Sequence, residues 1–74
     1  MKSRVKAILI EIIRNSQGEE PDIEITEQTT LREELGLDSF NLAELTVHIE
    51  EEFDIDIFED GIISTVGEIY EKLK

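Results

Sequence analysis

Apolar residues recur with the period of an α-helix in three separate segments of this chain. The first segment has the i, i+3, i+4, i+7 pattern of a helix with a single apolar face. Its members are Val5, Ile8, Leu9 and Ile12. Gly18 and Pro21 follow among polar residues, so this helix is predicted to end near Ser16.

A second helix is predicted to begin at Asp38 or Ser39 and to run to about Glu52. Four of its apolar side chains fall within a sector of about 80° on a helical projection, and they form its core face. They are Leu42, Leu45, Ile49 and Phe53.

A third segment is predicted to form the last helix. Thr65 and Glu68 have the spacing of a capping box, which marks a helix start. The apolar residues after this start keep helical spacing. They are Val66, Ile69, Tyr70 and Leu73.

Residues 17–38 form a long connection, which must be anchored if it belongs to so small a domain. Ile23 and Ile25 alternate with acids, as in an extended segment that lies on a core. Thr30 and Glu33 have capping-box spacing, and with Gly36 as a stop they predict a single helical turn.

A short element is also predicted near Phe58 to Ile62, where Gly61 limits its length. The elements together predict an all-α fold with three main helices, a short third helix and a long first loop. With 74 residues in total, we expect one domain over residues 1–74.

The charge of the chain is strongly one-sided. Its 19 acidic and 7 basic side chains leave a formal net charge of −12. From Glu33 to Glu71 there are 13 acids and no Lys or Arg. Such a surface argues against binding of nucleic acid or anionic lipid and favours basic protein partners. The chain has no Cys, which excludes disulfides and thiolate metal sites.

The N-terminal apolar run does not predict a membrane segment or a signal peptide. Glu11 and Arg14 interrupt it, and no stretch approaches the ~18 apolar residues of a membrane span. We expect a cytoplasmic monomer with no membrane insertion.

A second apolar group lies on the middle helix, away from its core face. Its members fall within about 60° of one another, and carboxylates flank them on both sides. The group comprises Phe40, Ala43 and Val47, with Glu44 and Glu51 on one side and Glu50 on the other. An apolar patch edged by acids is typical of a surface that binds a partner. The alternative is that the patch packs internally against a loop.

Ser39 stands directly after Asp38 at the predicted helix start. Both residue types are favoured at helix termini, which is the plainer interpretation of the pair. If Asp38 is the cap, the Ser39 hydroxyl is free and lies near exposed backbone N–H groups, which stabilise an attached anion. A serine hydrolase is excluded, because Ser39 has no G-x-S-x-G context and the only histidine, His48, lies nine residues further along the same helix. No metal site is predicted.

The stretch LGLDSFNLAEL from Leu35 to Leu45, followed by HIEEEFDIDI, resembles the acyl carrier proteins. The hallmark of that family is a Gly-x-Asp-Ser-Leu motif that opens a helix ending in an acidic run and Phe. The matching residues are Gly36, Asp38, Ser39, Glu44, Glu50, Glu51, Glu52 and Phe53. The opening of the last helix, Ser64-Thr65-Val66, matches as well, so the resemblance covers nearly the whole chain.

The resemblance implies a four-helix bundle with a short third helix and a non-catalytic carrier function. It implies that 4′-phosphopantetheine from coenzyme A is attached to Ser39, beside Asp38 of the motif, by a separate magnesium-dependent phosphopantetheinyl transferase. The thiol of this group would hold an acyl intermediate of fatty-acid, polyketide or related lipid biosynthesis as a thioester. Partner enzymes with basic patches would dock on the apolar patch and its acids. Candidate residues lining an acyl pocket are Leu45, Ile49, Ile57, Ile62 and Ile63, although core packing explains all five equally well.

Phe40 stands where the family most often has Leu, and Asp-Ser-Phe also resembles the D-alanyl carrier proteins. The chain also looks shorter than fatty-acid carriers between Ile57 and Thr65. Two alternatives therefore stay open. One is a D-alanyl or aminoacyl carrier of the peptidyl type, and the other is an acidic adaptor that uses the patch but lacks the attached group.

Overall fold

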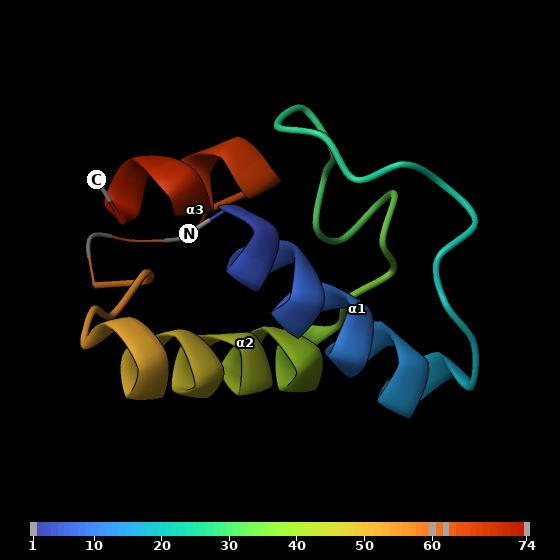
Figure 1. Cartoon of the computed structure of the whole chain (residues 1–74), viewed down its shortest axis with the longest axis horizontal. Coiled ribbons are helices and arrows are strands. Elements are labelled where there is room, and N and C mark those ends of the chain that lie inside the picture. The colour runs from blue at the N-terminus through green and yellow to red at the C-terminus, as the bar shows by residue number, and fades with distance from the viewer. Residues whose placement is uncertain (1, 60, 62, 74) are drawn as a thin grey trace.

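The computed structural model describes residues 2–59, 61 and 63–73. It contains three α-helices: α1 (Lys2–Gln17), α2 (Ser39–Phe53) and α3 (Val66–Lys72). In Figure 1, α3 lies at the top, α2 runs along the bottom, and α1 runs diagonally from beside α3 down to the level of α2, against which it packs. Within the described ranges there is no β-strand, so the all-α prediction is confirmed.

The apolar faces of the three helices meet in one core. All four predicted residues of α1 are buried, and Ile13 joins them. On α2, Leu45 and Ile49 are fully buried, whereas Leu42 and Phe53 pack against the core while partly exposed. The four predicted residues of the last helix are all buried as well.

The long connection between α1 and α2 is fastened to the start of α3. The Leu31 N–H donates to the Ser64 carbonyl at 2.8 Å, and the Val66 N–H donates to the Thr29 carbonyl at 3.0 Å. The Gly67 N–H also donates to the Glu27 carbonyl, at 2.9 Å. These bonds explain how so long a connection is held in place.

Two expectations about this connection were wrong in detail. Ile25 is buried, but Ile23 is 41% exposed and does not lie on the core. Thr30 is paired with Glu34 rather than Glu33: the Thr30 N–H donates to the Glu34 carboxylate at 2.9 Å, and the Glu34 N–H donates to the Thr30 hydroxyl at 3.0 Å. The turn is wider than a regular helix start, which shifts the partner by one residue.

Gly36 ends this turn, as predicted, because its backbone is left-handed with a φ of +71°. Its N–H donates to the Arg32 carbonyl at 3.1 Å, and the next N–H, that of Leu37, donates to the Leu31 carbonyl at 3.0 Å. The chain thereby turns Leu37 into the core and delivers Asp38 to the start of α2.

The segment after α2 contains turns where the short third helix was expected. The Glu59 N–H donates to the Asp56 carbonyl at 3.2 Å, and the Gly61 N–H donates to the Phe58 carbonyl at 3.1 Å. Positions 60 and 62 of the predicted element lie outside the described residues. Across the described ranges, no helix combines the length and the apolar character that crossing a membrane requires.

Candidate functional site

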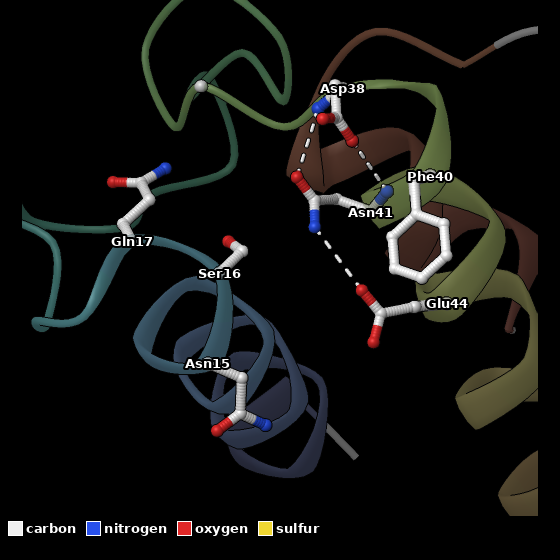
Figure 2. Close-up of a pocket in the computed structure, with 8 residues that line it drawn as sticks. Asn15, Ser16, Gln17, Asp38, Phe40, Asn41 and Glu44 are labelled. Atoms are coloured by element: carbon white, nitrogen blue, oxygen red, sulfur yellow. Dashed lines mark hydrogen bonds between the residues drawn. The ribbon is translucent and has the colours of Figure 1, made fainter.

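Asp38 caps the N-terminus of α2. Its backbone is extended, and its carboxylate accepts a hydrogen bond from the Asn41 N–H at 2.8 Å. In return, the Asn41 side-chain oxygen accepts a hydrogen bond from the Asp38 N–H at 3.2 Å (Figure 2). This reciprocal capping box satisfies two N–H groups of the helix start and leaves Ser39 as the first helical residue.

Asn41 is a residue of the α2 cap that the sequence patterns missed. Its side chain is 5% exposed, and it also donates to the Glu44 carboxylate at 3.3 Å. Figure 2 shows the resulting chain of contacts from Asp38 through Asn41 to Glu44. The available signal was the Asp-x-x-Asn spacing, which is the same i, i+3 spacing that identified the cap of α3.

Ser39 is exposed at the first turn of α2, where backbone N–H groups are not used by the helix itself. In the part of the chain that the structure describes, its hydroxyl makes no hydrogen bond. The separation of nine positions from Ser39 to His48 corresponds to about 13 Å along the helix axis. His48 therefore does not activate this hydroxyl, and the site suits attachment of a group by another protein rather than catalysis.

A small hollow adjoins Ser39 on one side of α2. It has a volume of about 240 Å³ and mostly apolar walls. Its lining residues are Arg32, Ser39, Leu42, Ala43, Thr46 and Phe58. Ser39 is therefore flanked by a surface against which a flexible attached group could lie.

A second, more polar hollow lies on the other side of the N-terminus of α2. It has a volume of about 350 Å³ and is lined by residues from the end of α1 and the start of α2. Figure 2 shows the end of α1 across from this start, with Ser16 between the two helices and Gln17 beside the loop that leads to Asp38. The Gln17 amide donates to the Leu35 carbonyl at 3.0 Å, which ties the end of α1 to the turn before α2. Three contacts therefore fix where α2 begins: this amide, the Gly36 turn and the Asp38 cap.

The predicted docking patch lies on the surface. Phe40 is 71% exposed and Val47 is 56% exposed, and Ala43 lies exposed between them. The alternative of internal packing therefore does not hold for these side chains. Together with Glu44 and His48 they form a shallow hollow on α2. Adjacent exposed apolar side chains with a polar rim are a pattern found at surfaces that bind a partner.

Acids surround this patch. Glu50 and Glu51 are exposed, and neither forms an ion pair with a residue that the structure describes. Glu44 is partly buried and accepts a hydrogen bond from Asn41. Arg4 of α1 pairs with Glu52 at the end of α2, and this contact raises the pKa of Arg4. Most of the negative charge on α2 therefore remains available to a partner.

The residues named for an acyl pocket lie in the core instead. Leu45, Ile49 and Ile57 are fully buried and Ile63 is 4% exposed, while Ile62 lies outside the described residues. None of these four described residues lines any of the surface hollows identified above. Within the described ranges, no group of three or more acidic or histidine side chains is arranged to hold a metal ion.

Comparison with known proteins gives a consistent result. A family model described as the phosphopantetheine attachment site matches residues 3–73. The mitochondrial acyl carrier protein of Saccharomyces cerevisiae is 41% identical over 59 residues, which cover 76% of this chain and 47% of that relative. This chain thus spans about half the length of the yeast relative. An acyl carrier protein of Syntrophobacter fumaroxidans is 34% identical over 67 residues, covering 88% of this chain and 82% of the relative. No solved structure matches.

Proposed function

Because this chain belongs to the acyl carrier protein family and matches the phosphopantetheine attachment model, we propose that Ser39 is the residue to which its 4′-phosphopantetheine is attached. The protein is a non-catalytic carrier. Its residues form one carrier domain. This domain presents a covalently bound intermediate to other enzymes. The thiol at the end of the attached group supplies the chemistry, because it holds the cargo as a thioester.

The observation that carries this proposal is the open Ser39 hydroxyl at a helix start that is already capped. Asp38 and Asn41 satisfy each other, so Ser39 is not needed as a cap. An attached phosphodiester gains from the unused N–H groups of the first turn of α2. The residues present therefore fit the group.

Attachment needs a phosphopantetheinyl transferase, because none of the described residues is hydrogen-bonded to the Ser39 hydroxyl in a way that could take up its proton. The Ser39 oxygen forms a bond to the phosphorus next to the pantetheine of coenzyme A. The bond between the bridging oxygen and that phosphorus breaks, the nucleoside 3′,5′-bisphosphate of coenzyme A leaves, and the hydroxyl proton passes to the transferase. This chain contributes an accessible nucleophile that is held in a fixed position by the α2 cap.

The proposed cargo is an acyl intermediate of fatty-acid, polyketide or related lipid biosynthesis. The names of the two relatives, both acyl carrier proteins, support an acyl rather than an aminoacyl load. A D-alanyl or other aminoacyl load is the alternative, and it rests on the Asp38-Ser39-Phe40 sequence. Intact mass of the protein purified from its own cell separates these loads, because the acyl and aminoacyl adducts differ in mass.

The proposed docking surface for the transferase and the acyl-processing enzymes is the apolar patch of Phe40, Ala43 and Val47 with its flanking Glu44, Glu50 and Glu51. Its support is the exposure of Phe40 and Val47 together with the surplus of carboxylates around them. Electrostatic attraction to a basic partner speeds the encounter, and a small contact area permits release.

The test of the attachment site is intact mass after incubation of the apo protein with coenzyme A and a promiscuous phosphopantetheinyl transferase. We expect a gain of one phosphopantetheinyl unit, which Ser39→Ala abolishes. Ser3→Ala, which removes an exposed serine hydroxyl on α1, should leave the gain intact. If the wild type gains no mass, the protein is an adaptor without the attached group and the proposal is wrong.

A further inference from the structure

Arg32 occupies an unusual place among the basic residues of this acidic protein. It is the only Lys or Arg between the end of α1 and the start of α3 in the sequence. The segment that follows it, from Glu33 to Glu71, has 13 acids and no Lys or Arg. Although Arg32 stands seven residues before Ser39, it lines the same hollow of about 240 Å³. The turn that ends at Gly36 brings the two residues to this hollow.

The side chain of Arg32 has no acidic partner in the described part of the chain. Lys2 pairs with Glu27 at 3.4 Å, and Arg4 and Arg14 pair with Glu52 and Glu20. Of the acids next to Arg32, Glu34 is bonded to both the N–H and the hydroxyl of Thr30. Lys6 also has no acidic partner among the described residues, but it does not line this hollow. Arg32 is therefore the unpaired cation that shares a hollow with Ser39.

We propose that Arg32 is a positioning residue that binds the phosphodiester of the group attached to Ser39; this inference rests on the proposed function of Ser39. The planar guanidinium has several N–H donors in a fixed arrangement and binds phosphate oxygens with charge-assisted hydrogen bonds. The attached group adds a negative charge to a protein that already has a net charge of −12. Arg32 offsets this charge and holds the phosphodiester end of the group at the edge of the hollow.

The walls of the hollow strengthen this pairing. Leu42, Ala43 and Phe58 are apolar neighbours of Arg32 and Ser39 there. No carboxylate is among the residues that line the hollow, so no acid there competes with the phosphodiester for the guanidinium. The pairing remains salt-sensitive, because the hollow is open to solvent and salt screens exposed pairs.

The test compares apo and holo protein by NMR, after intact mass has shown that Ser39 carries the group. The chain has three arginines, Arg4, Arg14 and Arg32, so each side-chain Nε–Hε resonance can be assigned. We expect the Arg32 resonance to shift when apo protein is converted to holo protein. The Arg4 and Arg14 resonances should stay in place and serve as internal controls.

The phosphorus resonance of the phosphodiester gives a second, independent measurement. We expect Arg32→Gln to shift it, and Arg32→Lys, which keeps the charge, to shift it less. Lys6→Gln removes the same charge from an exposed position on α1 that does not line the hollow, and it should leave the resonance unchanged. The difference between wild type and Arg32→Gln should shrink in about 1 M NaCl, where the Debye length is about 3 Å.

The two possible failures are distinguishable. If Ser39 gains the group but the Arg32 resonance does not move, and the phosphorus resonance is the same in Arg32→Gln, this inference is overturned while the proposed function stands. If the protein gains no mass at Ser39, both are overturned.

Discussion

Asp38 and Ser39 are neighbours in sequence with separate tasks. Asp38 supplies the cap of α2 and bonds with Asn41 in both directions, whereas the hydroxyl of Ser39 stays uncommitted. Both residue types are good helix caps, so the sequence alone left the start of α2 between them. The structure decides in favour of Asp38 through Asn41, a buried polar residue at the matching position.

Replacement of Asp38 should therefore weaken the start of α2. We expect Asp38→Ala to lower the free energy of unfolding by about 1 kcal/mol, within the range of roughly 0.5–2 kcal/mol for lost caps. Urea denaturation measures the effect. Asp22→Ala, at an exposed position in the long connection, is the control and should change stability little. Equal stability of the two variants would contradict the capping role.

Tyr70 should make the protein sensitive to alkaline pH. Burial raises the pKa of its hydroxyl above the usual 10.0, and the negative charge of Glu27 adds to this effect. In the unfolded chain the hydroxyl ionises near its usual pKa, so the unfolded state loses this proton first as pH rises. The contribution to stability is complete below pH 10 and is lost as pH rises through the folded pKa.

The measurement is urea denaturation as a function of pH, together with tyrosinate absorbance, since Tyr70 is the only tyrosine. As pH rises above 10, the free energy of unfolding should fall less in Tyr70→Phe than in wild type, because the variant lacks this ionisable hydroxyl. At pH 7 the variant should be as stable as wild type or more so, because the buried hydroxyl has no hydrogen-bond partner among the described residues. A wild-type tyrosine that ionises at its ordinary pKa in the folded protein would refute the burial argument.

Among the elements, α1 and α3 were predicted well because their apolar faces have an unbroken helical period. The ends of α1 and α2 fall within one residue of expectation, at Gln17 and Phe53. The long connection was harder. Alternation at Ile23 and Ile25 indicates an extended segment, but it does not tell which side chain faces the core. The wider turn at Thr30 shifted its carboxylate partner to Glu34.

Gly67 joins the start of α3 to the long connection at very short range. A Cβ at this position would lie 2.9 Å from the Glu27 carbonyl oxygen, which is a backbone atom with little freedom to move. We expect Gly67→Ala to destabilise the protein by about 1–3 kcal/mol, the usual cost of overpacking. The backbone amide of residue 67 should also exchange its hydrogen faster in the variant, because its bond to the Glu27 carbonyl is weakened.

Ser3→Ala provides the control for Gly67→Ala, because it introduces alanine at an exposed helical position without a close contact. At Gly67 itself, alanine is a better helix former than glycine by about 1 kcal/mol, which opposes the steric cost. A Gly67→Ala variant that is more stable than wild type would show that helix propensity outweighs the steric contact.

The carboxylates of α2 give a test of docking at the level of this helix. Glu51 is a cleaner position than Glu44, because Glu44 also accepts a bond from Asn41. We expect Glu51→Lys to slow loading by the transferase several-fold at low salt, with unchanged helicity by circular dichroism. Glu19→Lys makes the same charge change in the long connection and should have a smaller effect. Identical loading rates for wild type and Glu51→Lys at low salt would refute the patch assignment.

For the molecule as a whole, the excess of acids is the main source of internal repulsion. At a net charge of −12, screening should favour the folded state more than it weakens the three ion pairs that the described residues form. We therefore expect the melting temperature to rise between low and about 0.15 M NaCl. Sucrose at the same osmolality controls for solute exclusion. A melting temperature that falls with salt would mean that the ion pairs outweigh the repulsion.

At this scale, sequence patterns predicted the fold class, the core faces and the exposed serine, all of which depend on local periodicity or a short motif. They did not predict that Arg32 and Ser39 share one hollow. That proximity depends on how the Gly36 turn is oriented and on Phe58, which lies beyond α2. Contacts between distant segments are set by packing, and a single sequence carries no direct signal of them.

The hydrogen bonds that join residues 27–31 to residues 64–67 determine where the chain can be cut or truncated without loosening the segment before α2. The stretch leading into Ser39, the proposed attachment residue, is braced by the opposite end of the chain, through Ser64, Val66 and Gly67. Removal of the C-terminal helix would therefore loosen a segment more than thirty residues upstream of the cut. A break in the turns between Asp54 and Gly61, by contrast, would spare that brace. Protease nicks or tags that disturb α3 should thus impair modification even though α3 lines none of the hollow beside Ser39.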